Sequence, residues 1–322
     1  MDSITDYLFD RRQLRRKLSF WRVAAVLCLI IAAGTATWRM MDGGQVAHLQ
    51  PHIARLNIEG VITGDRATLK LIDDISQSHA SAVIVSIESP GGSTSGSERL
   101  YDALRRLSQK KPVVAVVGGM AASGGYIAAM GTDHIVAQGT SLVGSIGVLF
   151  QYPNASKLLD TVGVKMEEVK SSPLKAAPNP FEPASPEARA ALADLVRDSY
   201  DWFKTLVRER RQLDGSALAA VVDGRVFTGR QAIGLKLIDE LGSEKEAIAW
   251  LEAEKNIAKD LPVRDWRRRR GIDNLGLLGM ASLGAQALGF HEIAQGLARA
   301  EQMHQSAVLD GLMSIWHASP VN

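Results

Sequence analysis

Short apolar runs alternate with amphipathic segments along the middle of the chain, and this alternation predicts an α/β domain. The runs at 82–87 and 112–117 are almost continuously apolar, which is typical of strands buried on both faces of a parallel sheet. The pattern predicts strands over 53–62, 82–87, 112–117, 134–137 and 164–169, and over the run after the turn at 139–148. It predicts helices over 66–78 and 154–161, after Ser93 with Leu100, Leu104 and Leu107 on one face, and after Ser123.

The pattern of apolar and polar residues changes after Lys170. Prolines are frequent from there to Pro186, and they predict a loop. Pro186 then begins a long predicted helix to about Arg211, with Ser185 as its N-cap. A strand–helix unit over 224–242 and a capped helix over 243–255 follow. We therefore place one globular domain over residues 52–255.

The ends of the chain differ from this domain. Residues 1–22 carry a basic block, residues 23–40 are apolar enough to predict a transmembrane anchor, and 41–51 form a linker. The positive-inside rule leaves the basic block in the cytoplasm and the domain outside it. A signal peptide cleaved after the small residues 33–36 and a buried core helix are the alternatives.

Residues 256–322 are predicted to form a helical tail. A basic cluster lies at 264–270, and the pattern over 293–316 indicates an amphipathic helix. The tail fits a membrane surface or a subunit contact, and the cluster is also compatible with a solvated charge run. The sequence leaves these alternatives open.

Composition narrows the function classes. The chain has 322 residues, 46% of them hydrophobic, and a net charge of +2, which gives no reason to expect a nucleic-acid partner. It has one cysteine, Cys28, so neither a disulfide framework nor a Cys/His zinc site is expected. No metal or cofactor is predicted.

The candidate chemistry centres on Gly118–Met130, which follows the run at 112–117. The glycines are expected to end the strand, and a helix is expected to begin at Ser123. Free backbone N–H groups gather at such a helix start, so a serine there is suited to act as a nucleophile beside an oxyanion site. The alternative is a plain serine N-cap in a glycine-rich turn.

Four motifs accompany this stretch in order. They are Ile87-Glu88-Ser89-Pro90-Gly91-Gly92, Met120-Ala121-Ala122-Ser123-Gly124-Gly125-Tyr126, Gly144-Ser145-Ile146-Gly147-Val148 and Arg225-Val226-Phe227-Thr228-Gly229. Together, after an N-terminal anchor, they resemble the signal peptide peptidase A family, bacterial membrane-anchored serine–lysine peptidases of the Clp protease/crotonase superfamily. The resemblance spans about residues 52–255 and implies a Clp protease/crotonase-like spiral of ββα units.

The resemblance also implies roles for individual residues. Ser123 matches the nucleophile, Lys175 matches the general base, and Ser145 matches a serine that positions the lysine. Backbone N–H groups of Gly92, Gly91 and Gly124 match the oxyanion hole. The segment 170–175 reads Lys-Ser-Ser-Pro-Leu-Lys where the family commonly has Gly and an aromatic residue before the lysine, so Lys170 is a competitor for the base.

A lysine accepts the serine proton only when it is neutral, and burial among apolar groups favours that form. Activity is therefore expected to rise toward mildly alkaline pH. None of the seven histidines falls in a motif, and His134, on an apolar strand, is more typical of a core residue than of a base.

The resemblance implies peptide substrates, namely cleaved signal peptides and unfolded apolar chains, and a homo-oligomer at the extracytoplasmic side of the bacterial inner membrane. Two other function classes compete. A crotonase-type acyl-CoA enzyme would use carboxylates such as Glu88, and a catalytically silent scaffold would need neither Ser123 nor Lys175.

Overall fold

The computed structural model describes residues 50–267 and 312–315, with isolated positions near residues 21–28 and 292–296. The chain divides into two units, residues 1–51 and 52–322. Among the described positions, no helix is both long and apolar enough to cross a membrane. The predicted anchor at 23–40 lies almost wholly outside the described residues.

The second unit is built on one mixed sheet of ten described strands. The central strands β1, β2, β3, β4 and β8 pair in parallel, and β5 joins the far end of β3 in parallel. The strands are β1 (His52–Ile62), β2 (Ala80–Ser93), β3 (Val113–Ala122), β4 (His134–Ala137), β5 (Leu142–Gly144), β6 (Leu149–Phe150), β7 (Val226–Thr228), β8 (Glu240–Leu241), β9 (Val263–Trp266) and β10 (Leu312–Ile315). The predicted α/β class with largely parallel pairing is confirmed.

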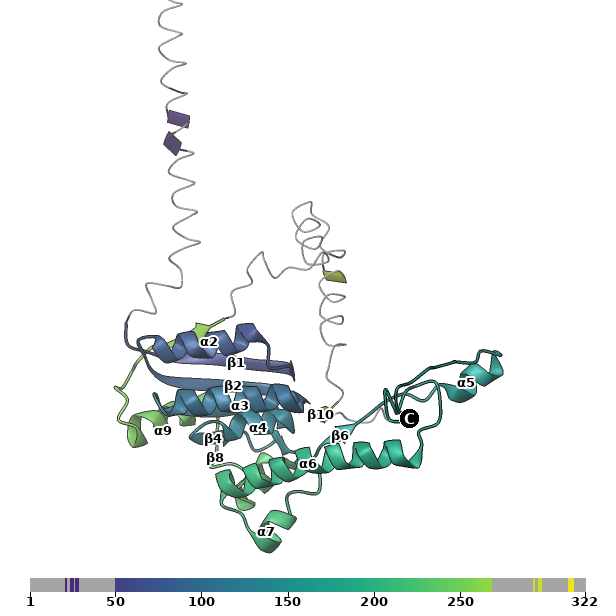
Figure 1. Cartoon of the computed structure of the whole chain (residues 1–322). Helices are drawn as coiled ribbons and strands as arrows, with labels where there is room; N and C mark the ends of the chain where they lie inside the picture. The colour runs from purple at the N-terminus through teal and green to yellow at the C-terminus, as the bar shows by residue number, and fades with distance from the viewer. Residues whose placement is uncertain are drawn as a thin grey trace, which may run out of the picture. The chain divides into compact units, whose positions relative to one another are not determined.

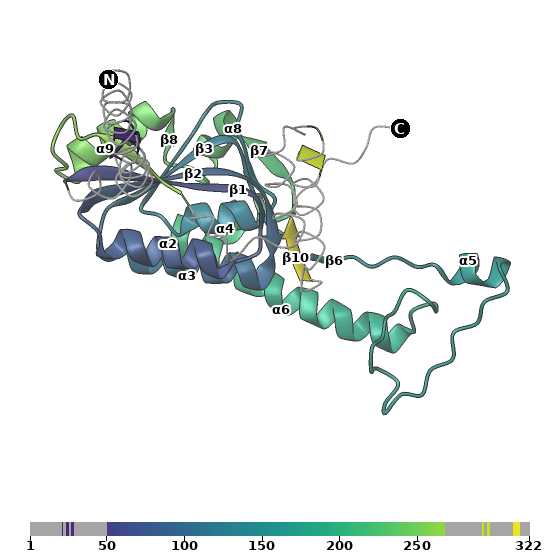
Figure 2. The same cartoon turned by 90° about the horizontal axis from the view of Figure 1, so that it is seen from above.

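Helices cover both faces of this sheet. Figure 2 shows α2, α3 and α4 along one face and α9 on the other. The described helices of this unit are α2 (Arg66–Gln77), α3 (Thr94–Ser108), α4 (Gly124–Met130), α5 (Ser156–Thr161), α6 (Pro186–Arg211), α7 (Gly215–Ala219), α8 (Gly229–Gly234) and α9 (Glu244–Glu254).

Strand periodicity divides the buried residues into two clusters. Along β3, Val113, Ala115 and Val117 belong to the large cluster on the α2–α4 side. Val114 and Val116, between them, belong to the smaller cluster with Leu251 of α9. Side chains alternate between the faces of a strand, so both faces are apolar only when both are covered. This explains the continuous apolar runs in the sequence.

Two central strands run further than the sequence predicts. Gly118 and Gly119 were expected to end one strand, and the other was predicted over 82–87 only, but β3 continues to Ala122 and β2 to Ser93. The glycines serve close backbone approach instead. A Cβ on Gly92 would lie 1.9 Å from the Ile62 carbonyl oxygen of β1, so only glycine fits there.

The segment between β6 and α6 differs from the prediction. Residues 164–169 form no strand, and Val164, Met166 and Val169 are largely exposed. We call residues 151–185 the arm, and Figures 1 and 2 both show it extending away from the sheet. The apolar alternation that predicted a strand has no partner strand in the described chain.

Helix α6 follows the arm and is confirmed from Pro186 to Arg211. The Ser185 hydroxyl accepts the Ala188 N–H at 3.1 Å, as expected of the N-cap. Only its second half packs on the core, through Phe203, Leu206 and Val207.

Two segments assigned to the helical tail are strands. Residues 263–266 form β9, which pairs in parallel with β1, and residues 312–315 form β10. Trp266 donates its indole N–H to His52 at 3.0 Å, and Asp265 pairs with Arg55. The first residues of the basic cluster at 264–270 are thus part of the sheet. They cover an edge of β1 that would otherwise be open.

Candidate active site

Strand β3 changes partners halfway along its length. Val114–Val117 pair with β4, whereas Met120–Ala122 pair with β5. Gly118 and Gly119 lie at the change, and the Gly119 N–H donates to the Glu88 carboxylate at 2.6 Å. The carboxylate that the acyl-CoA alternative would use therefore supports the backbone here.

Ser123 lies at the turn from β3 into α4, as predicted. Its side chain is buried, and its backbone has φ 55° and ψ −115°. Few non-glycine residues adopt such a conformation, which costs about 1–3 kcal/mol and persists only where the surroundings enforce it. Its N–H donates to the Gly144 carbonyl at 2.7 Å, which helps to hold the turn. A strained strand-to-helix turn of this kind presents the nucleophilic serine in α/β-hydrolases.

Helix α4 is fixed at both ends. At its start, a Cβ on Gly125 would lie 2.7 Å from the Ser89 carbonyl oxygen, so α4 packs closely on β2. At its end, the Arg210 guanidinium donates to the carbonyls of Met130 and Thr132. Between them, the buried Tyr126 hydroxyl donates to the Leu237 carbonyl at 2.8 Å, and burial raises the pKa of Tyr126. The position of Ser123 is therefore set by packing on three sides.

Ser145 lies beside Ser123 because of the strand register. Ala122 of β3 pairs with Gly144 of β5 in parallel, and the two serines are the next residues on each strand. Adjacent strands are about 4.8 Å apart. Ser145 is buried, has φ 51°, and donates its N–H to the Arg225 carbonyl at 2.8 Å.

The same register gathers the four motifs. Strand β5 pairs antiparallel with β7, which carries Val226–Thr228 of the fourth motif. A Cβ on Gly144 would lie 3.0 Å from the Phe227 ring, so the glycine of the third motif leaves room for the phenylalanine of the fourth. The motifs therefore occupy four neighbouring strands, β2, β3, β5 and β7.

The glycines predicted to supply the oxyanion hole differ in the hydrogen bonding of their backbone N–H groups. Gly91 donates its N–H to the buried Ser89 hydroxyl at 3.1 Å. Ser89 in turn donates to the Gly60 carbonyl at 2.7 Å. Gly124 is the first residue of α4, where helical N–H groups lack intrahelical acceptors. The sequence reasoning missed Ser89, although its place beside Pro90 at the end of a buried strand was an available signal.

The structure does not bring Lys175 to Ser123 within this chain. Lys175 lies in the exposed arm, and its ammonium makes no hydrogen bond or ion pair within the described residues. Lys170 lies in the same arm but is engaged: its ammonium lies 2.6 Å from Glu168 and 2.8 Å from Glu182. Hydrogen bonds to Glu168 and Glu182 raise the pKa of Lys170. A raised pKa keeps the amine protonated and disfavours its use as a base.

His134 packs against other side chains of the fold, as expected for a core histidine and not for a catalytic base. Its ring stacks on Trp250 with centroids 4.4 Å apart, and its Nε2 lies 3.2 Å from the Glu240 carboxylate. Within the described residues, no group of acidic, His and Cys side chains is arranged to hold a metal ion.

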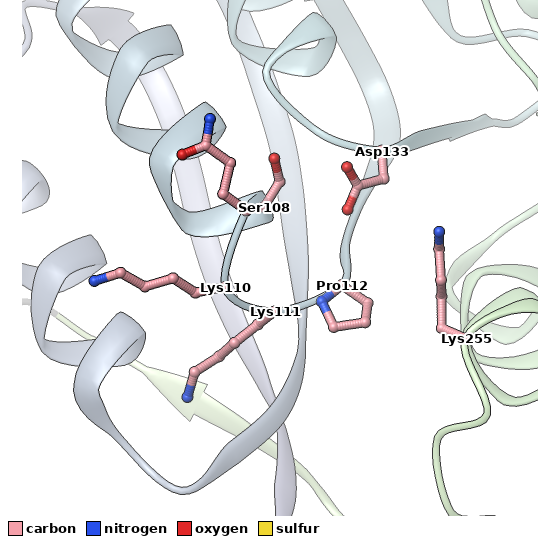
Figure 3. A pocket seen from close by; sticks show the side chains of 7 residues that line it. Ser108, Lys110, Lys111, Pro112, Asp133 and Lys255 are labelled. Atoms are coloured by element: carbon pink, nitrogen blue, oxygen red, sulfur yellow. The ribbon is translucent and has the colours of Figure 1, made fainter.

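A hollow of about 290 Å³ lies elsewhere on the surface (Figure 3). It is lined by Ser108–Pro112, Asp133 and Lys255, at the start of β3. Ser123 follows the other end of this ten-residue strand, about 33 Å away at 3.3 Å per residue. Lys111 donates to the carbonyls of Ser78 and Ala80 there, so the hollow is a junction between β2, α3 and β3.

Models of two known peptidase families match the part of the sequence that forms the candidate site. The sequence model of peptidase family S49 matches residues 105–258, which include Ser123, Ser145 and Lys175. The model of Clp protease matches residues 66–138, which include Gly91, Gly92 and Gly124.

Curated relatives match over most of the described domain. A protein of Synechocystis, named as a candidate protease, is 35% identical over 243 residues, 70% of this chain and 88% of the relative. A protein of Enterococcus faecium with the provisional name signal peptide peptidase SppA is 32% identical over 176 residues, 54% of this chain and 51% of the relative. The chloroplastic serine protease SPPA of Arabidopsis thaliana is 30% identical over 219 residues, 67% of this chain but 32% of the relative.

A mixed α/β sheet that carries a strained serine at a strand-to-helix turn, with these relatives, defines a serine peptidase. The chain belongs to peptidase family S49, the signal peptide peptidase A family.

Proposed function

We propose that this chain is a membrane-anchored endopeptidase in which Ser123 is the nucleophile and Lys175 the general base. The observation that carries the proposal is the turn at Ser123, where a buried serine is held in a strained conformation beside Ser145 and the start of α4. No other described serine combines such a turn with the four motifs.

The proposed reaction has two halves. Neutral Lys175 takes the proton of the Ser123 hydroxyl as its oxygen attacks the scissile carbonyl carbon, and N–H groups of Gly92 and Gly124 receive the oxyanion. The lysine then gives that proton to the leaving amine, which produces an acyl-enzyme on Ser123. Water, deprotonated by the same lysine, hydrolyses this ester and regenerates the serine.

The choice of Lys175 over Lys170 rests on their contacts. Two carboxylates hold Lys170 in its charged form, whereas Lys175 has no ion pair among the described residues. Lys175 is thus available for a site that removes it from water, and such removal favours the neutral amine.

We propose that assembly of several copies of the chain brings Lys175 to a Ser123 of a neighbouring copy. The arm extends away from its own sheet in both views. It also exposes large apolar side chains that a contact with another copy would bury, as expected for an interaction surface. These are Leu158, Val162, Val164, Met166, Val169, Leu174 and Phe181.

The proposed substrates are signal peptides left after cleavage and other unfolded apolar chains, at the extracytoplasmic side of the bacterial inner membrane. The apolar segment within 23–40 supports the membrane location. The name of the Enterococcus faecium relative supports the substrate class. The proposal includes the Clp protease/crotonase-like spiral of ββα units as the fold of each copy.

Hydrolysis of a quenched apolar peptide by the full chain in detergent tests the proposal. Ser123→Ala and Lys175→Ala should each lose nearly all turnover, whereas Lys170→Ala should retain it. The two inactive variants should then be co-expressed, so that mixed assemblies form. Recovered activity is expected, because one copy supplies the lysine and its neighbour supplies the serine.

Two outcomes count against the proposal. Full activity of folded Lys175→Ala would remove the lysine from the mechanism. Mixed assemblies, verified by two affinity tags, that stay inactive would show that each chain uses its own lysine.

A further inference from the structure

Asn179 is the one buried residue of the arm, all of which the structure describes. Only 9% of Asn179 is accessible to water, whereas the other residues of the arm are half-buried or exposed. Asparagine usually lies at the surface, and a polar side chain that is buried needs hydrogen-bond partners. The partners of Asn179 therefore show what its burial achieves.

The amide of Asn179 joins two stretches of the arm. Its Oδ1 accepts the N–H groups of Phe181 at 2.9 Å and Glu182 at 3.2 Å, which also fixes the orientation of the amide. Its Nδ2 donates to the carboxylates of Glu182 at 2.8 Å and Glu168 at 3.4 Å. The Lys170 ammonium bridges the same two carboxylates. We call Glu168, Lys170, Asn179 and Glu182 the clamp.

The clamp closes a loop of eight residues, 171–178, that contains Lys175. Inside the loop, the Lys175 N–H donates to the Ser172 carbonyl at 3.1 Å, and the Ala177 N–H donates to the Leu174 carbonyl at 3.2 Å. Hydrogen bonds of exposed turns open easily, because few packed side chains support them. The shape of the loop therefore depends on the clamp at its base.

We propose that Asn179 is a positioning residue that closes the base of the loop 171–178 and so holds Lys175 in the conformation in which its amine reaches the serine hydroxyl. This inference rests on the proposed function, in which Lys175 is the general base. A reacting group must be held closely, because a displacement of about 1 Å can cost about 100-fold in rate. In the arm as the structure describes it, no other side chain is buried, so hydrogen bonds to one buried amide replace a packed core.

The buried amide and the ion pairs of the clamp differ in what they contribute. The Glu182 side chain is 54% exposed, and ion pairs that water reaches contribute little. Removal of the amide, by contrast, leaves two N–H groups and two carboxylates without the partner that now satisfies them. We therefore expect the loop to stay closed in Lys170→Ala, in agreement with the turnover expected of that variant, and to open in Asn179→Ala.

Hydrogen exchange tests the closure without any turnover. In the full chain with Ser123→Ala, the amides of the loop 171–178 should exchange about tenfold faster after Asn179→Ala. Asn154→Ala is the matched control, because the Asn154 amide oxygen also accepts a backbone N–H in the arm, that of Ser156 at 3.1 Å, but lies outside the clamp. The control should leave exchange in the loop unchanged. Equal exchange with and without Asn179 would overturn the proposal, whether or not the protein cleaves peptides.

A double-mutant cycle tests whether the closure serves the base. In the parent chain, Asn179→Ala should lower kcat about 10- to 100-fold with little change in KM, whereas Asn154→Ala should match the parent. In the Lys175→Ala chain, Asn179→Ala should not slow the labelling of Ser123 by a serine-reactive peptidyl fluorophosphonate any further, because a residue that acts through the lysine has no effect without it. An equal loss in both backgrounds, or no loss in the parent chain, would contradict the positioning role.

The two experiments separate the failure of this proposal from that of the proposed function. Full activity of folded Lys175→Ala would remove the base, and the positioning role with it, even where exchange shows that Asn179 closes the loop. Unchanged exchange in Asn179→Ala would remove the positioning role and leave the serine–lysine assignment intact.

Asn179→Asp tests the donor half of the amide. It retains an oxygen that can accept the N–H groups of Phe181 and Glu182, but it replaces the Nδ2 donor with a third carboxylate beside Glu168 and Glu182. At neutral pH it should open the loop at least as far as Asn179→Ala, as read by hydrogen exchange. An Asn179→Asp chain with the exchange of the parent would contradict the proposal.

Discussion

The close packing of α4 on β2 is tested by Gly125→Ala. The added Cβ would lie 2.7 Å from the Ser89 carbonyl oxygen, a backbone atom that lacks the freedom of a side chain. Carbon–oxygen contacts lie near 3.3–3.6 Å, so α4 must move away from β2 by about 0.6 Å or more.

Two opposing terms set the stability change. Alanine gains up to about 1 kcal/mol over glycine in a helix. Overpacking against a fixed neighbour costs about 1–3 kcal/mol, so we expect a net loss of about 0–3 kcal/mol. In a domain of this size each kcal/mol corresponds to roughly 2–4 °C in Tm. The larger effect should be on catalysis, because a shift of about 1 Å in a reacting group can cost about 100-fold in rate.

The assay is thermal unfolding together with peptide hydrolysis by the full chain, and Gly234→Ala is the matched control. Gly234 is also helical, but a Cβ there would meet nothing within 4 Å. The control should keep its kcat and a Tm at or above that of the parent. Gly125→Ala should lose at least about tenfold in kcat. Parental kcat and Tm in Gly125→Ala would refute the packing argument.

Three further predictions concern the site and its support. Ser145→Ala should lower kcat about 10- to 100-fold, because a hydrogen bond to a charged group contributes about 1.5–3 kcal/mol; steady-state kinetics with unchanged kcat would remove Ser145 from the mechanism. Tyr126→Phe should destabilise the fold by about 1–3 kcal/mol, because it leaves the Leu237 carbonyl without its buried donor; an unchanged Tm would contradict this. The peptidase rate should rise between about pH 6 and about pH 10, because only a neutral lysine accepts the serine proton; a flat rate with chemistry limiting would exclude a lysine base.

Sequence patterns sufficed where local chemistry decides the structure. The helix from Pro186 to Arg211 has its N-cap in the preceding residue, Ser185, and its first-turn acid and last-turn arginines within its own residues. The buried strands were visible because both faces of the sheet are covered. The turn at Ser123 was predicted because a strand and a helix leave distinct patterns on either side of it.

Long-range pairing explains what the sequence patterns missed. Residues 88–93 read as the end of a strand and a turn because of Pro90-Gly91-Gly92, yet β1 and β10 pair with this segment from 29 or more residues away and make it a strand. Residues 312–315 fall within a helical pattern, but an open edge of β2 lies where they can pair. Residues 164–169 show the reverse, because a strand-like alternation without a partner strand forms no strand.

In the site, too, local patterns predicted some residues, whereas the position of another depends on long-range contacts. Ser123 and Ser145 directly follow the neighbouring strands β3 and β5, and Gly91 and Gly92 lie on β2 beside β3, so one register places them together. Lys175 lies in the arm, and its position relative to Ser123 depends on contacts beyond one chain in our proposal. No local pattern carries that information.

Covalent labelling of the serine tests the central assignment most directly. The full chain, its Lys175→Ala variant and its Ser123→Ala variant would be treated with a serine-reactive peptidyl fluorophosphonate and examined by peptide mass spectrometry. We predict a single adduct on Ser123 in the parent chain, greatly slowed in Lys175→Ala and absent from Ser123→Ala. No adduct on folded, assembled parent chain, or an adduct formed at an unchanged rate in Lys175→Ala, would contradict the serine–lysine mechanism.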